Sequence, residues 1–376
     1  MEKIHLSVNG HVLLEHFKKY FAQSLQHFPS LYVKNFMPDV KDGDKLPNHL
    51  FYLCPLCASN FIMVLKTEQA DGTFEESVKL TSDFSLDHYP PESAGGKNKV
   101  LVCKTCNNTA GHAYDLEVKK HIQHVSLGKE GVSTKVDIKH NIEGVGYFSG
   151  MLESNEKNEW VFHMKKQEKD KIKPVDEWIA DSNKKDFTIT ITMPTPKDEP
   201  FQKAMLKTAY LYCFSHFGYE FVFSRAGNLI RKVLKGEAEY PIKVAPLQFE
   251  RHNQKHFDNI TIGVCYISQP QNLRSFVVNI KLKYIENGYE AIHSVFIPDP
   301  TEMGVEDLKR IPLAIQAQEH TDIEITSLNN ILHSTPLAYS QTWLQMKDLV
   351  KKNEGVLTPQ SSKRTTTCTP GLLSAP

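Results

Sequence analysis

The sequence predicts an α+β fold, in which a small cysteine-containing element precedes a mixed, strand-rich region. Three observations lead to this prediction. Two Cys-x-x-Cys pairs lie in the first third of the 376-residue chain, with 45 residues between them. Beyond about residue 130, apolar and polar residues alternate in several short runs, which is the period of half-buried strands. A long apolar stretch over 201–223 is typical of a buried central helix.

The first 50 residues form a predicted N-terminal helical segment. Apolar side chains recur at roughly helical spacing over 10–26, and Pro29 ends the run. We expect this helix to pack against the element that follows, which we place at residues 51–128.

The two cysteine pairs are Cys54 with Cys57 and Cys103 with Cys106. Two residues between paired cysteines let one tight turn direct both sulfurs to the same point, so the four thiolates suit one tetrahedral, structural Zn²⁺. Four buried thiols without a metal are the simpler alternative, which the paired spacing disfavours. The other cysteines are scattered and odd in number, which argues against a disulfide framework. They are Cys213, Cys265 and Cys368.

The long insert between the two pairs holds the densest polar cluster of the chain. Asp87-His88 is followed by Pro90-Pro91, by Gly95-Gly96 and by Asn98. Two glycines between short runs predict a turn that joins two strands. We therefore interpret the zinc site as the structural support of a second, polar site.

At these residues the chain resembles the HNH nuclease family, whose ββα-metal element consists of two short strands and a helix. The family pattern has an acidic residue or His before a His, then a Pro, a Gly-Gly turn, an Asn five residues before a Cys-x-x-Cys pair, and a polar residue opening the next helix. The matching residues are Asp87, His88, Pro90, Gly95, Gly96, Asn98 and Asn107. The resemblance covers about residues 54–115 and implies a zinc-bound ββα-metal domain.

The resemblance also implies the activity of a metal-dependent HNH endonuclease, which hydrolyses phosphodiester bonds. His88 would be the general base that activates water, a role suited to a side chain that titrates near neutral pH, and Asn98 would orient its ring. A catalytic Mg²⁺ or Mn²⁺ would be held by Asp87 and by Asn107, which aligns with the helical ligand of the family. His112 lies four residues after Asn108 on one helical face and is a further predicted ligand. Many family members have His in place of Asn107, which leaves the ligand set open. Asp115 is an alternative ligand or a helix-surface residue.

The chain has no net charge, because 44 Lys and Arg residues balance 44 Asp and Glu residues. A nucleic-acid enzyme without net charge needs a local basic face. Lys97, Lys99 and Lys104 lie within the motif and are predicted to bind nucleic-acid phosphates. A second basic run at 165–173 is interrupted by acidic residues, and we interpret it as a solvated loop.

The remainder of the chain predicts an α+β accessory domain over 129–350, which binds either the substrate or a protein partner. Helices are expected at 201–223 and 226–234, and the last three strands are expected to share one sheet, with a hairpin turn at Gly288. The predicted strands span 132–138, 145–152, 160–164, 187–193, 260–267, 275–285 and 291–297. Residues 351–376 are rich in Ser, Thr and Pro, which predicts a disordered tail.

Composition adds expectations about location and partners. No apolar run is long enough to cross a membrane, and the chain does not open with a signal-peptide pattern, so we expect a cytoplasmic protein. The expected partner is nucleic acid, with DNA favoured over RNA. A homodimer and an activating protein partner both stay open, and the family permits a role in restriction or phage defence.

A second function, from a different class, also fits the sequence. The chain would then be a non-catalytic zinc-ribbon module that binds nucleic acid or a protein, with Asp87 and His88 in structural roles. Asp87, His88 and Asn98 occur together, which favours the enzyme, because a structural ribbon needs only its thiolates.

Overall fold

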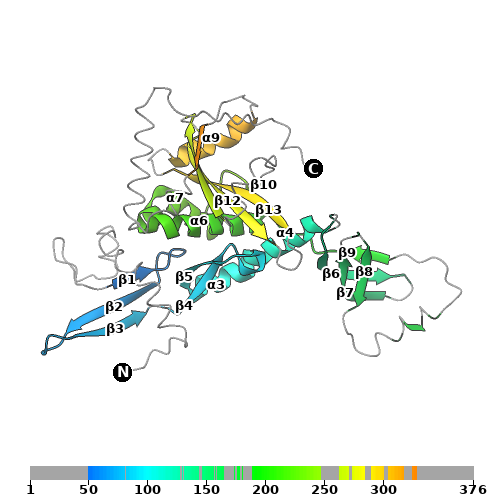
Figure 1. Ribbon diagram of the computed structural model, residues 1–376, viewed down its shortest axis with the longest axis horizontal. Helices are drawn as coiled ribbons and strands as arrows, with labels where there is room; N and C mark the ends of the chain where they lie inside the picture. The colour runs from blue at the N-terminus through cyan, green and yellow to red at the C-terminus, as the bar shows by residue number, and fades with distance from the viewer. Residues whose placement is uncertain are drawn as a thin grey trace.

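The computed structural model is a mixed α+β structure with several antiparallel sheets and few helices (Figure 1). It describes residues 50–80, 82–127, 131–143, 146–155, 159–164, 189–246, 262–270, 273–283, 289–299, 304–316 and 324–327, with single positions between some of these ranges. The predicted helix at 10–26, the turn at Gly288, most of the basic run at 165–173 and the tail at 351–376 lie outside the described residues.

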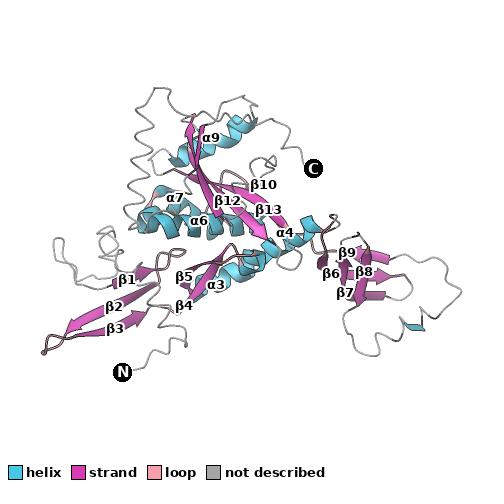
Figure 2. Cartoon of the chain, viewed as in Figure 1, coloured by secondary structure: helices cyan, strands magenta, loops and turns pink. Residues whose placement is uncertain are grey.

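The strands of the described residues pair in four antiparallel sheets, drawn in magenta in Figure 2. Their orders are β1-β2-β3, β4-β5, β8-β7-β6-β9 and β10-β13-β12-β11-β14. The strands are β1 (Leu50–Leu53), β2 (Phe61–Glu68), β3 (Phe74–Leu80), β4 (Phe84–Tyr89), β5 (Asn98–Cys103), β6 (Thr134–Ile142), β7 (Gly146–Ser154), β8 (Trp160–Met164), β9 (Ile189–Thr192), β10 (Ala245–Pro246), β11 (Ile262–Gln269), β12 (Ser275–Lys283), β13 (Glu290–Pro298) and β14 (Glu324–Ser327). The helical segments are η2 (Glu92–Ala94), α3 (Lys104–Ala110), η3 (Gly111–Asp115), α4 (Leu116–Ser126), α6 (Asp198–Phe223), α7 (Arg225–Leu234) and α9 (Gly304–Gln316).

Two strands and a helix follow one another in the region of the polar motif. Strand β4 pairs with β5 from Phe84 opposite Cys103 to Tyr89 opposite Asn98. Strand β5 leads directly into α3, which contacts both strands of the hairpin. The helical run then continues through η3 and α4 to Ser126. The order of elements therefore brings residues of β4 and α3 close together.

The turn between β4 and β5 depends on two glycines, which confirms the predicted turn. Gly95 has a φ of 82°, in the left-handed region that favours glycine. A Cβ atom on Gly96 would lie 1.6 Å from the carbonyl oxygen of Pro90. Gly95 also packs against Lys283, because a Cβ on Gly95 would lie 3.0 Å from the Cβ of Lys283. The turn therefore links the hairpin to the end of β12.

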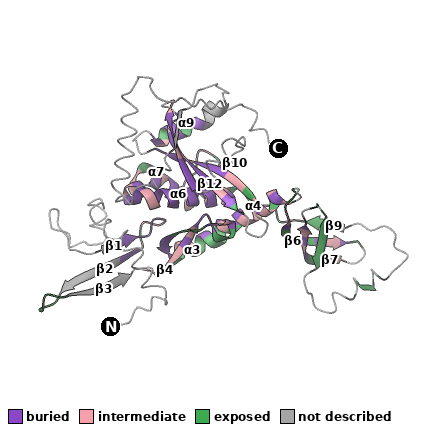
Figure 3. Ribbon diagram, viewed as in Figure 1, coloured by how far each residue is buried: buried purple, intermediate pink, exposed green. Residues whose placement is uncertain are grey.

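Helix α6 lies at the centre of the molecule, and Figure 3 shows most of it as buried. One side contacts β4, η3 and α4, and another contacts β12 and β13. On the first side, the Tyr210 hydroxyl donates to the carbonyl oxygen of Pro55 at 2.7 Å. Elsewhere Phe217 stacks on Phe276 of β12, with 5.6 Å between ring centroids. The predicted buried central helix is confirmed, and one hydrophobic cluster joins the cysteine element to the five-stranded sheet.

A bend in α6 places a second aromatic side chain on the cysteine element. Gly218 has a φ of 65° and a ψ of −151°, which interrupts the helical geometry. Beyond it, the Tyr219 hydroxyl donates to the carbonyl oxygen of Leu53 at 2.6 Å and accepts from the Leu53 amide at 2.8 Å. Both backbone groups precede Cys54 directly, so the helix fixes the approach of the first cysteine pair.

The sheet β8-β7-β6-β9 projects away from the rest of the molecule (Figure 1). The chain leaves α4 to form it and returns to α6, where the Lys197 amide donates to Glu117 of α4 at 2.9 Å. The sheet is therefore inserted between two helices that touch each other. Most of the large apolar side chains that are exposed among the described residues lie on this sheet. They are Tyr147, Trp160, Val161, Phe162, Met164 and Ile191.

Most predicted elements are present with shifted ends. Strand β8 has its predicted bounds, and α6 begins three residues before the predicted position 201. The last three predicted strands share one sheet as expected, with β10 and β14 at its edges. The hairpin β2-β3 was not predicted, although Asp71-Gly72 marks its turn. In the described part of the chain, no helix combines the length and apolarity that a membrane span requires.

Candidate metal centre and polar site

The four predicted zinc ligands come together as expected. Cys54 and Cys57 lie in the loop after β1, Cys103 ends β5, and Cys106 lies in α3. Their sulfur atoms are all within 4.8 Å of one another. The Cys57 and Cys103 sulfurs are 3.9 Å apart. Sulfurs placed about 2.3 Å from a tetrahedral Zn²⁺ would be about 3.8 Å apart, so this cluster has the geometry of a structural metal site.

Amide groups point at the sulfur atoms. The Cys103 amide donates to the Cys54 sulfur at 3.3 Å. Asn60 donates from its backbone to Cys57 at 3.4 Å and from its side chain to Cys103 at 3.3 Å. Burial raises the pKa of the Cys54 thiol, and the three neighbouring cysteines raise it further. The N–H donors favour the thiolate form that Zn²⁺ requires.

His88, the predicted general base, lies near the end of β4, opposite Lys99 of β5. Its side chain is half-buried. Burial lowers the pKa of His88, and the charges of Lys99 and Lys207 lower it further against the opposing effect of Glu92. These effects favour the neutral imidazole, which is the state that a proton acceptor needs.

Asn98, the second predicted catalytic residue, is exposed at the start of β5 and pairs in register with Tyr89 rather than with His88. Among the described residues, no hydrogen bond joins the Asn98 and His88 side chains. Its role in orienting His88 stays a prediction.

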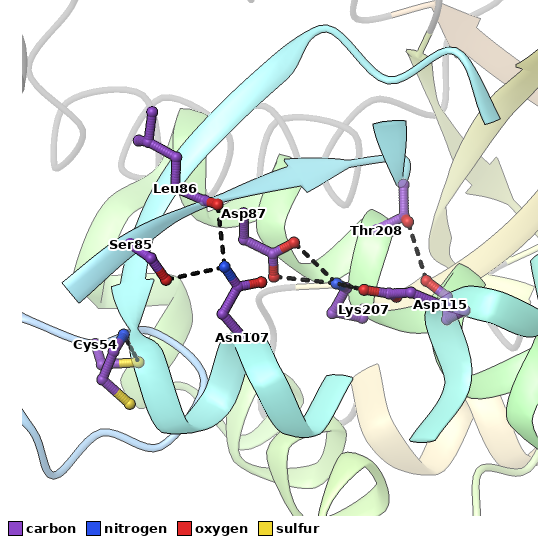
Figure 4. A network of polar contacts seen from close by, with 10 residues as sticks. Cys54, Ser85, Leu86, Asp87, Asn107, Asp115, Lys207 and Thr208 are labelled. Carbon is purple, nitrogen blue, oxygen red and sulfur yellow. Dashed lines mark hydrogen bonds and ion pairs between the residues drawn. The ribbon is translucent and has the colours of Figure 1, made fainter. Parts of the chain in front are cut away.

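Asp87 lies on the opposite face of β4 and is deeply buried, with 4% of its surface exposed. Figure 4 shows its carboxylate directed at Lys207 of α6. The Lys207 ammonium donates to both Asp87 oxygens at 3.0 Å and to Asp115 Oδ2 at 2.6 Å. Burial raises the pKa of Asp87, an effect that the adjacent Lys207 charge opposes. The three side chains form a buried cluster of two acidic groups around one ammonium.

Asn107 joins α3 to β4. Its side-chain amide donates to Ser85 Oγ at 2.9 Å and to the carbonyl oxygen of Leu86 at 3.1 Å. Figure 4 shows Asn107 beside Asp87, so these two predicted metal ligands lie together. His112, the third, is exposed on η3 and does not join them.

The arrangement does not fit the predicted catalytic Mg²⁺ or Mn²⁺. Both Asp87 oxygens accept hydrogen bonds from Lys207, and Asn107 is the one other predicted ligand near them. Six-coordinate Mg²⁺ requires carboxylate oxygens that are free to bind it at about 2.1 Å. The four-cysteine cluster, in contrast, fits a structural zinc.

The three predicted phosphate-binding lysines are exposed around the hairpin and the start of α3. Lys99 stands opposite His88. Lys104 lies 3.9 Å from Asp83, and both side chains are well exposed. Such a surface pair contributes little and leaves the lysine accessible to other anions.

Lys207 is the residue of this site that the motif did not reveal. The signal was present, because Lys207 is a charge in the middle of a helix that is apolar on nearly all sides. A lysine in such a helix must find a buried acidic partner, but its identity depends on contacts between residues 120 positions apart.

Comparisons with known proteins found no match to this chain. The chain matches no protein-family model, no curated protein sequence and no solved structure.

Proposed function

We propose that this protein is an endonuclease of the HNH type, which hydrolyses phosphodiester bonds in nucleic acid, with DNA favoured over RNA. One observation carries the proposal. The β4-β5 hairpin leads into α3 beside a four-cysteine cluster, and half-buried His88, whose pKa is lowered by burial, lies near the end of β4. This is the arrangement that the HNH resemblance implies for residues 54–115.

In this proposal His88 is the general base. Its imidazole accepts a proton from a water molecule, and the water oxygen attacks phosphorus. The bond from phosphorus to the 3′ oxygen breaks, and the departing 3′ oxygen takes a proton from solvent water to become a hydroxyl group. Lys99, directly opposite His88, binds the phosphate and offsets its negative charge. The four cysteines would hold a structural zinc, which would tie the loop after β1 to the junction of β5 and α3 and so position the hairpin.

A non-catalytic zinc module is the second candidate, and the Lys207 cluster favours it. A nuclease whose Asp87 binds a divalent ion would keep that carboxylate accessible, whereas here Asp87 is buried and bound to Lys207. In this second function the exposed lysines of the hairpin bind nucleic acid without cleaving it.

Cleavage assays separate the two functions. Supercoiled plasmid, single-stranded DNA and RNA are incubated with the full-length protein and Mg²⁺, Mn²⁺ or EDTA, and zinc content is measured in each sample. We expect the wild type to nick nucleic acid and His88→Ala to lose at least 100-fold in rate, as is typical for removal of a general base. His124→Ala is the matched control, because His124 is exposed at the end of α4.

The outcomes distinguish clearly between the candidates. Cleavage that is lost in His88→Ala and kept in His124→Ala supports the endonuclease. Equal, background-level cleavage by all three proteins, with nucleic acid still bound, supports the zinc module. The EDTA sample tests the sequence-based prediction of a catalytic Mg²⁺, provided that the structural zinc is retained.

A further inference from the structure

The Lys207 ammonium occupies the cation-binding oxygens of Asp87. An ammonium group has three N–H donors. Two of them point at the oxygens of Asp87 and the third points at Asp115, at 3.0, 3.0 and 2.6 Å. Lys207 is fully buried, so water does not compete for these hydrogen bonds. Every donor of the ammonium is therefore used inside the protein.

A divalent ion at Asp87 would meet this ammonium at close range. Mg²⁺ binds a carboxylate oxygen at about 2.1 Å, and each Asp87 oxygen is already 3.0 Å from the nitrogen of Lys207. Two positive charges that share one carboxylate in a buried site repel each other strongly. The ion could enter only if Lys207 left a site that satisfies all of its donors.

We infer that Lys207 is the resident cation of this site and takes the place that the HNH resemblance gives to a divalent metal ion, so that the protein binds no divalent ion through Asp87. The inference stands on the buried contacts of α6 with β4 and η3. It does not require that the protein cleaves nucleic acid, and it is tested by ion binding rather than by activity.

The oxygen atoms around Lys207 could bind a divalent cation if the ammonium were absent. Asp115 Oδ1 is buried and accepts no hydrogen bond among the described residues. Asn107 donates through its amide nitrogen, and its side chain lies beside Asp87 in Figure 4. Carboxylate and amide oxygens are the ligands that Mg²⁺ and Mn²⁺ prefer. Replacing Lys207 by a neutral residue should therefore open a divalent-cation site.

Manganese binding tests the inference on the full-length, zinc-loaded protein. Free Mn²⁺ is measured by electron paramagnetic resonance during titration of the wild type, Asp87→Asn, Lys207→Gln and the double variant. We expect the wild type and Asp87→Asn to bind Mn²⁺ equally. We expect Lys207→Gln to gain one Mn²⁺ per chain and to lose it again when Asp87→Asn is added.

Two results would overturn the inference. One is a stoichiometric Mn²⁺ site in the wild type that Asp87→Asn removes. The other is a folded Lys207→Gln protein that gains no Mn²⁺. If Lys207→Gln does not fold, the comparison of the wild type with Asp87→Asn decides the question by itself. A cleavage assay can fail or succeed without changing any of these results.

Discussion

At the scale of single residues, Lys207 is a fully buried charge that is paired with two acidic side chains. Its ammonium and the carboxylates of Asp87 and Asp115 stabilise one another only as a group, because each would be unpaired in a buried site without the others. The same type of pair occurs at the surface between Lys243 and Asp198, at 2.9 Å. The two lysines therefore allow a direct comparison of a buried and an exposed ion pair.

We predict that Lys207→Met lowers the free energy of unfolding by about 3–5 kcal/mol, because it leaves two buried acidic groups without their cation. Lys243→Met should leave the free energy of unfolding nearly unchanged, because water already screens its exposed pair. Urea unfolding at pH 7 measures both. Equal effects of the two substitutions would show that the Lys207 cluster contributes no more than a surface pair.

The buried side chain of His293 in β13 should make the stability of the fold depend on pH. It is buried against His121 and Phe201, and neither ring nitrogen has a hydrogen-bond partner. Burial lowers the pKa of His293 from 6.5 to about 4. In this range the unfolded chain binds a proton that the folded protein excludes. The stability of the fold is therefore full above pH 6.5 and falls as the pH drops toward 4.

His293→Phe should remove this contribution. Between pH 7 and pH 4.5 the wild type should lose about 2 kcal/mol more free energy of unfolding than the variant does, as the linkage of proton binding to folding requires. Urea unfolding at the two pH values gives the difference. If the two proteins respond equally to acid, His293 does not titrate in the way that its burial implies.

At the scale of elements, the sequence predicted what local patterns encode. The β-rich run at 160–164 predicts the bounds of β8, and the apolar run at 201–223 predicts most of α6. The four cysteines and the turn at Gly95-Gly96 were predicted because their spacing is itself the signal. Partner choice was not predictable in this way. Strands β6 to β9 form one sheet and strands β11 to β13 belong to another. This division depends on pairing between segments that are distant in the sequence, and the local alternation of apolar and polar residues does not encode it.

The turn between β4 and β5 gives the sharpest test of an element. Gly96→Ala would place a Cβ 1.6 Å from the carbonyl oxygen of Pro90, and this oxygen belongs to the backbone, so it cannot rotate away as a flexible side chain can. We predict a strongly destabilised protein with reduced zinc content. Gly111→Ala is the control, because it is helical and a Cβ there meets nothing within 4 Å.

The control should be neutral or stabilising by up to about 1 kcal/mol, since alanine is the better helix former. Thermal unfolding and zinc analysis of both variants check the prediction. A stable, zinc-replete Gly96→Ala protein would show that the turn does not need this close approach.

At the scale of the whole molecule, one core joins the cysteine element, α6 and the five-stranded sheet. This core continues across the predicted domain boundary at residues 128 and 129. The apolar residues of the β8-β7-β6-β9 sheet are not part of this core cluster. The division into a nuclease domain at 51–128 and an accessory domain at 129–350 stays a prediction. The structure itself indicates an inserted sheet on a continuous core.

This architecture predicts that the inserted sheet can be removed. Lys197, which follows the inserted sheet, contacts Glu117 near the start of α4. The end of α4 lies about ten residues further along this helix, which is roughly 15 Å at the rise of an α-helix. A linker that replaces residues 131–194 has to span this distance. A flexible linker of about eight residues suffices. The shortened protein should keep its zinc and unfold in one cooperative transition, as followed by circular dichroism. Loss of zinc or of cooperative unfolding would show that the sheet is part of the core.

Chemical rescue provides a direct test of whether His88 activates water for phosphodiester hydrolysis. His88→Gly removes the imidazole and leaves space at the end of β4, and free imidazole is then added to the plasmid-cleavage assay. We expect that cleavage disappears in His88→Gly and returns as the imidazole concentration rises, while the wild type does not respond. Cleavage by His88→Gly at the wild-type rate without imidazole would contradict it.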